Sequence, residues 1–221
     1  MMEIRKPEPE QLLGYECMFF DFDGVVLESG DIKTEAFIEL FAGLGIDEEV
    51  KEHHLSNQGI SRYEKFQWIT ENLLKRKYTE EVKEKLGDRF ASLVKQKVIA
   101  APFVKGFSEM IEHIRKHDIY CVVASGTPQS ELVSIVNERR LNAWFDEVHG
   151  SPRKKDEIVK EVWERKPFSP EKCLFFGDAS TDFEAAQNVN IDFFARLTDD
   201  MSAYWSQVFY KYGQSDFSDL L

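Results

Sequence analysis

An apolar run from Cys17 to Phe20 stops at two aspartates, Asp21 and Asp23, which are followed directly by Gly24. The run is short, apolar and aromatic, which is typical of a buried strand. Side chains alternate across a strand, so residues two apart point the same way and the two carboxylates leave the strand end together. Like charges this close repel unless a cation lies between them, so the pair indicates a Mg²⁺ site, an acid–base pair or both. The glycine allows a tight turn.

A second apolar run, from Ile119 to Ala124, ends in three small residues, Ser125, Gly126 and Thr127. The run again has the length and composition of a buried strand. A hydroxyl and free backbone N–H groups at the end of a strand can hold phosphate oxygens. The alternative is an ordinary turn, because serine, glycine and proline are common in turns.

A third apolar run, Cys173–Phe176, ends in Gly-Asp, and a further acid follows one helical turn later. Asp178 can complete a carboxylate site for a hard cation, and Asp182 can support that site from behind. Between the second and third runs, Lys154 and Lys155 offer positive charge that can neutralise a transferring anionic group. Lysine pairs are otherwise mostly solvated surface residues.

The order of these segments, Asp-x-Asp, Ser/Thr, Lys and then Gly-Asp-x-x-x-Asp, resembles the haloacid dehalogenase-like superfamily from about Tyr15 to about Ala195. Strands alternate with helices in the second half of the chain, which indicates a doubly wound parallel sheet. The resemblance implies an α/β fold with a Rossmann-like core formed by residues 1–30 and 102–221. It also implies an inserted all-helical cap of the C1 type over residues 31–101, where apolar residues follow helical spacing.

The same resemblance implies phosphoryl transfer through a covalent aspartyl phosphate. Asp21 would attack phosphorus, while Asp23 would protonate the leaving oxygen and then deprotonate the attacking water. Mg²⁺ would offset the repulsion between carboxylate and phosphate. Of the two lysines, Lys155 is preferred because Ser-Pro-x-x-Lys is the spacing of similar phosphatases, although Lys154 stays open. The implied ligands are Ser125, Gly126, Thr127 and Lys155 for the phosphoryl oxygens, and Asp21, Asp178, Asp182 and the carbonyl of Asp23 for the metal ion.

The segment from Gln58 to Arg62 resembles the cap loop Lys-Gly-x-x-Arg of β-phosphoglucomutase-like enzymes. Its arginine would hold a second anionic group of the substrate as a planar fork, and the alternative is a loop arginine paired with a nearby glutamate. The loop lysine is replaced by Gln58, and the hinge histidine of hexose-phosphate mutases by Lys33, which weakens the case for a mutase. His53 and His54, just before the loop, are further candidates for a substrate contact.

We therefore expect a Mg²⁺-dependent phosphatase that acts on a small-molecule phosphate monoester, similar to phosphoglycolate phosphatase and β-phosphoglucomutase-like enzymes. The presence of Asp23 supports this expectation, because dehalogenases and phosphonatases of this kind replace the second aspartate. A phosphosugar mutase and a non-catalytic binding module with the same fold are the alternatives. The natural substrate and the oligomeric state are left open.

The net charge of −12 argues against a nucleic-acid or anionic membrane partner, because no basic stretch offsets it, and a small phosphorylated metabolite is the expected partner. No apolar stretch is long enough to span a bilayer, and the polar N-terminus shows no secretory signal. Cys17, Cys121 and Cys173 fall in the expected core strands, an odd number that indicates reduced packing residues in a cytoplasmic protein. The first dozen residues are expected to form a loose arm.

Overall fold

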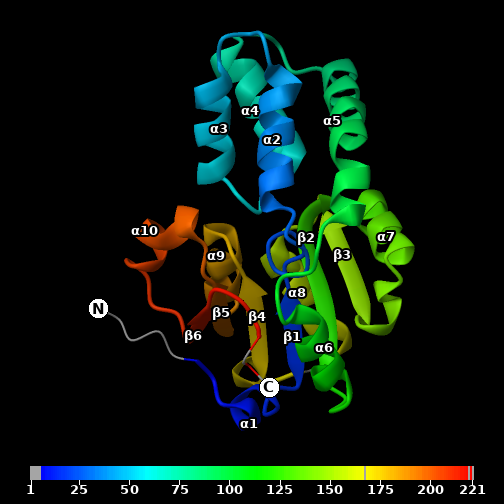
Figure 1. Cartoon of the computed structure of the whole chain (residues 1–221), viewed down its shortest axis with the longest axis vertical. Coiled ribbons are helices and arrows are strands. Elements are labelled where there is room, and N and C mark those ends of the chain that lie inside the picture. The colour runs from blue at the N-terminus through cyan, green and yellow to red at the C-terminus, as the bar shows by residue number, and fades with distance from the viewer. Residues whose placement is uncertain (1–5, 167, 219, 221) are drawn as a thin grey trace.

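A parallel sheet forms the centre of the molecule in the computed structural model, which describes residues 6–166, 168–218 and 220 (Figure 1). The strands of the described residues lie in the order β3-β2-β1-β4-β5-β6, and every neighbouring pair is parallel. Their bounds are β1 Cys17–Phe20, β2 Tyr120–Pro128, β3 Glu147–Ser151, β4 Cys173–Gly177, β5 Asp192–Arg196 and β6 Tyr212–Gln214.

Helices cover both faces of this sheet, as the apolar runs predict. In β1, Phe20 packs with the helices α6 (Phe107–Arg115) and α7 (Gln129–Glu138), whereas Phe19 packs on the opposite face with α8 (Lys155–Arg165). Side chains alternate across a strand, so a central strand covered on both sides must be apolar at every position. The α/β, Rossmann-like doubly wound parallel sheet is thereby confirmed.

Between β1 and α6 the chain forms helices that stand beyond one end of the sheet, whereas α6 lies beside the sheet (Figure 1). Their interior is aromatic: the ring centroid of Phe37 lies 5.5 Å from that of Phe66 and 4.7 Å from that of Phe90. These helices are α2 (Gly30–Phe41), α3 (Asp47–Ser56), α4 (Arg62–Trp68), a π-helical continuation over Ile69–Leu73, and α5 (Glu80–Ala100).

The prediction of a loose arm over the first dozen residues is wrong for residues 9–12. A short helix, α1 (Pro9–Leu12), ends in Leu12, which is fully buried against the main core. The apolar side chain is removed from water there, which orders the backbone that carries it. Residues 1–5 lie outside the described residues.

The remaining chain completes the layers around the sheet. None of the helices in the described residues is long and apolar enough to cross a membrane. The other elements are α9 (Ser180–Asn188), α10 (Ser202–Trp205) and short 3-10 turns over Leu141–Ala143, Pro170–Lys172 and Asp199–Met201.

Candidate active site

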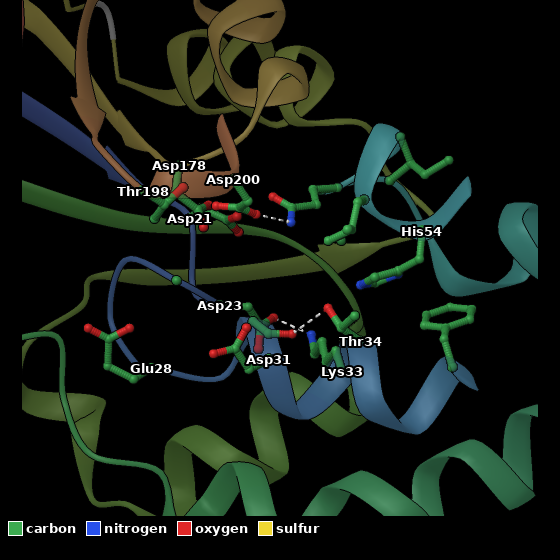
Figure 2. A pocket seen from close by; sticks show the side chains of 18 of the residues that line it. Asp21, Asp23, Glu28, Asp31, Lys33, Thr34, His54, Asp178, Thr198 and Asp200 are labelled. Carbon is green, nitrogen blue, oxygen red and sulfur yellow. Dashed lines mark hydrogen bonds and ion pairs between the residues drawn. The ribbon is translucent and has the colours of Figure 1, made fainter. Parts of the chain in front are cut away.

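A pocket of about 780 Å³ lies between the carboxyl ends of the central strands and the helices α2–α5. Asp21 follows β1, Asp178 follows β4, and both line this pocket. In the strand order, β1 and β4 are the neighbours at which the winding of the chain reverses, which is where open α/β sheets bind ligands. Figure 2 shows Asp21 and Asp178 on one side of the pocket and His54 on the other.

Asp21 is held rigidly at the end of β1. Its backbone N–H donates to the carbonyl of Phe176 at 2.9 Å, and its Oδ1 accepts from the N–H of Phe22 at 2.7 Å. Its Oδ2 lies 3.0 Å from the Nζ of Lys155. Burial raises the pKa of Asp21 to about 7, although the ammonium of Lys155 opposes this shift. A further cation beside Asp21 would likewise oppose this shift and favour the charged form.

Lys155, rather than its neighbour Lys154, reaches the site. It is the first residue of α8, it is only 6% exposed, and its Nζ forms ion pairs with both Asp21 and Asp182. Lys154 is exposed. Asp182 also accepts the backbone N–H of Ala179 at 3.1 Å, so its carboxylate fixes the position of Lys155.

Three carboxylates form a group that fits a hard cation. Oxygen atoms of Asp21, Asp178 and Asp182 all lie within 4.8 Å of one another. Burial, and then the nearby carboxylates of Asp21 and Asp182, raises the pKa of Asp178 well above its ordinary value, because each of them disfavours its charged form. Gly24 leaves room for this group, since its φ is +81° and a Cβ there would overlap the Asp178 carboxylate. Oxygen donors of this kind suit a divalent cation such as Mg²⁺.

The carboxylate of Asp23 lies outside this group and has partners of its own. Its Oδ1 accepts from Ser29 Oγ at 2.6 Å, and its Oδ2 accepts from Thr127 Oγ1 at 2.9 Å and pairs with Lys33. Burial alone would raise its pKa, but the Lys33 ammonium and these hydrogen bonds hold the pKa of Asp23 below its ordinary value. A metal contact from this residue would therefore use its backbone carbonyl, as the resemblance implies.

Lys33 and Ser29 are site residues that the sequence argument did not assign. Lys33 lies on the first turn of α2 and also donates to Thr127 Oγ1 at 2.7 Å. The available signal was its position: the first turn of a helix that begins shortly after Asp23 can face back toward the strand end. In the sequence, Lys33 stands out only as a replacement for the hinge histidine of the mutases.

The end of β2 brings its small residues under the loop before α4. The Oγ of Ser125, a fully buried residue, accepts the N–H of Thr127 at 3.1 Å. A Cβ at Gly126 would clash with the carbonyl of Gly59, so glycine permits the close approach of the two segments. All three small residues line the pocket, where their polar groups can meet a phosphate.

Arg62 lines the pocket but is already paired. Both of its terminal nitrogens donate to Glu131, at 2.8 and 2.7 Å, and its guanidinium lies 4.6 Å from the ring centroid of Phe90. Of the two roles expected for Arg62, the structure shows the pairing with a glutamate, here Glu131. A substrate contact through this guanidinium requires the pair with Glu131 to open.

The chain matches the family model described as haloacid dehalogenase-like hydrolase over residues 18–196. A phosphorylated carbohydrates phosphatase of Thermotoga maritima is 25% identical over 186 residues, which cover 80% of this chain and 82% of that protein. A β-phosphoglucomutase structure from Clostridium difficile has a TM-score of 0.76 at 18% identity, covering 94% of this chain and 93% of that one. A predicted phosphoglycolate phosphatase from Haemophilus somnus has a TM-score of 0.72 at 14% identity, covering 94% and 96%.

Proposed function

Because the chain belongs to the haloacid dehalogenase-like hydrolases, we propose that it is a phosphatase that hydrolyses a small-molecule phosphate monoester through an aspartyl phosphate on Asp21. One observation carries this proposal: the Asp21 carboxylate follows the carboxyl end of β1, lies 3.0 Å from Lys155 Nζ, and lines the pocket together with Asp178. The similarity to a phosphorylated carbohydrates phosphatase favours a sugar phosphate as the substrate.

We propose that Mg²⁺ is held by the carboxylates of Asp21 and Asp178. The bound ion would supply charge that offsets the repulsion between two anions, a nucleophilic carboxylate and a phosphate. Asp182 supports this arrangement through Lys155, whose ammonium pairs with both Asp182 and Asp21. The raised pKa values of Asp21 and Asp178 support the need for a cation here.

In the proposed reaction, Asp21 attacks phosphorus and the bond from phosphorus to the leaving oxygen breaks. Asp23, which must hold a proton when the ester binds although Lys33 lowers its pKa, gives that proton to the leaving oxygen. It regains a proton from the water that hydrolyses the aspartyl phosphate. Lys33 and Thr127 hold the Asp23 carboxylate in place for both transfers. The proposed hydrogen-bond donors for the phosphoryl oxygens are Lys155, the Ser125 hydroxyl and the N–H groups of Gly126 and Thr127. The Thr127 N–H would have to leave its present hydrogen bond to Ser125 Oγ for this role.

We further propose that residues 31–101 act as a cap domain and that residues 1–30 and 102–221 form the catalytic core. The division is supported by the aromatic interior of α2–α5, in which Phe37, Phe66 and Phe90 pack on one another. A cap over the strand ends would exclude water and carry the contacts that select the substrate. Buried, free thiols at Cys17, Cys121 and Cys173 support a cytoplasmic location.

The test is Mg²⁺-dependent release of inorganic phosphate from a panel of sugar phosphates, phospho-acids and nucleotides. Release should disappear in Asp21→Asn and in EDTA. Release that persists in Asp21→Asn would contradict the proposed nucleophile. Conversion of one phosphosugar isomer to another without phosphate release would instead support the mutase, which the likeness of fold to β-phosphoglucomutase keeps as the second candidate.

A further inference from the structure

A buried lysine on α4 faces the pocket without an acidic partner. Lys65 is 3% exposed and lines the pocket. Its Nζ lies 3.0 Å from Nδ1 of His54 and 5.3 Å from the ring centroid of Phe37. Among the described residues, no carboxylate lies within ion-pair distance of it. Three donors on this ammonium thus face a ring nitrogen, a distant carbonyl and an aromatic face.

The other cations at this pocket that are mostly buried differ from Lys65, because each has an acid. A paired cation contributes little net field, since its charge is already neutralised. The pairs are Lys33 with Asp23, Lys155 with Asp21 and Asp182, Arg62 with Glu131, and Arg196 with Glu28.

His54 does not neutralise the Lys65 ammonium, because a histidine ring carries either no charge or a positive one. Burial, together with the nearby Lys65, lowers the pKa of His54 to about 2, so the ring is neutral and its Nδ1 accepts from the ammonium. Burial and the neighbouring Lys33 and Lys155 lower the pKa of Lys65 to about 7. An unpaired ammonium in such a place is costly, and an anion brought by a ligand would remove that cost.

The two sides of the pocket therefore offer separate binding sites to a ligand. On the core side, Asp21, Asp178 and Lys155 form the site proposed for the transferred phosphate. On the opposite side, where Figure 2 places His54, the wall carries the unpaired ammonium of Lys65. One molecule that satisfies both sides has an anionic group at each end.

We propose that Lys65 and His54 form a subsite for a second anionic group, so that the substrate carries a carboxylate or a second phosphate besides the phosphate that is transferred. Lys65 binds this group directly, and His54 holds the ammonium in place through Nδ1. Arg62 does not take this role while both terminal nitrogens of its guanidinium donate to Glu131. The inference rests on the proposed phosphatase function and names its substrate class.

Matched pairs of esters test the inference in the Mg²⁺-loaded enzyme. Glycerol 3-phosphate is compared with 3-phosphoglycerate, which adds a carboxylate, and fructose 6-phosphate with fructose 1,6-bisphosphate, which adds a phosphate. At least one pair should differ about tenfold or more in kcat/KM in favour of the doubly anionic member, as expected for a charge-assisted hydrogen bond. Lys65→Met should bring that ratio close to one, mainly through KM, and Lys65→Arg should restore part of it. Lys51→Met, at an exposed position on the pocket rim, should leave the ratio unchanged.

Two results would overturn the subsite while leaving the phosphatase intact. One is a ratio near one for both pairs in the wild-type enzyme, a measurement that needs no variant to fold. The other is an equal loss on both members of a pair in Lys65→Met, which is what a purely structural lysine would give. p-Nitrophenyl phosphate, which has no second anion, tests the phosphatase separately. If neither this ester nor any other releases phosphate, the proposed function fails and the subsite fails with it.

Discussion

Replacing Lys155 with methionine tests the electrostatic account of the site. The Lys155 ammonium lies 3.0 Å from Asp21 Oδ2 and also pairs with Asp182, and all three side chains are at most 5% exposed. Methionine keeps most of the aliphatic stem, so the main change is that two buried carboxylates lose their cation. Removing one partner of a buried ion pair costs about 3–5 kcal/mol of the free energy of unfolding. For a chain of this length that corresponds to a Tm lower by about 10 °C.

The loss should depend on pH in a definite direction. The pKa of Asp21 in the folded protein, about 7, lies above its ordinary value of 3.8, so the carboxylate destabilises the fold as pH rises through this window. Lys155 opposes that shift, so without it the pKa of Asp21 rises further. At pH 5.5 the acid can take up a proton instead of staying charged and unpaired. The Tm difference between wild type and Lys155→Met should therefore be larger at pH 8 than at pH 5.5.

Thermal unfolding followed by circular dichroism in EDTA measures both effects without a bound metal. Lys154→Met is the matched control, because it removes the same charge from the exposed neighbouring position. Adding Asp182→Asn to Lys155→Met should recover part of the loss, since one of the two unpaired acids is then neutral. An equal drop in Tm at the two pH values, or no drop at pH 8, would refute the reasoning.

Three further predictions concern the metal group and Asp23. Mg²⁺ should raise Tm more at pH 8 than at pH 5.5, because protons compete with the ion for the carboxylates. Asp178→Asn should abolish this rise in Tm, and an unchanged rise in the variant would contradict Asp178 as a ligand. Gly24→Ala should lower Tm and phosphate release more than Gly43→Ala, since both glycines have positive φ but only Gly24 lies against a carboxylate. Lys33→Met should lower kcat about 10- to 100-fold and move the acidic limb of the pH–rate profile to higher pH, because Lys33 lowers the pKa of Asp23. A move of this limb to lower pH would exclude this role for Lys33.

The central strands could be predicted from the sequence, and the edge strands could not. β1 and β4 are covered on both faces, so their sequences are continuous apolar runs that stand out from the rest of the chain. β3 lies at one edge of the sheet and includes Glu147 and His149, which pair with each other. Its pattern is not that of a buried strand, because only part of it is covered.

The site was predictable where it follows directly from those strands. Asp21 and Asp178 are adjacent because two parallel neighbours end at the same edge of the sheet. Contacts made by the inserted helices depend instead on how those helices sit over the sheet, which local spacing does not encode. The pairing of Arg62 with Glu131, 69 positions later, and the approach of Lys65 to His54 belong to this second kind. The sequence alone therefore predicts which side chains meet at the strand ends better than it predicts the contacts of the inserted helices.

Gln58 links these two parts of the site. Its side-chain amide donates to Asp200 at 3.0 Å, and its carbonyl accepts from Thr181 Oγ1 at 2.8 Å, so this residue fastens the loop before α4 to the core. A lysine here would exchange an exposed hydrogen bond for an exposed ion pair, a change worth less than about 1 kcal/mol in stability. Glutamine at this position therefore closes the loop about as well as a lysine would, and it adds no charge to the pocket. On this wall Lys65 is the buried cation that has no acidic partner among the described residues, so in the proposed subsite a second anion on the substrate would meet Lys65 rather than the loop.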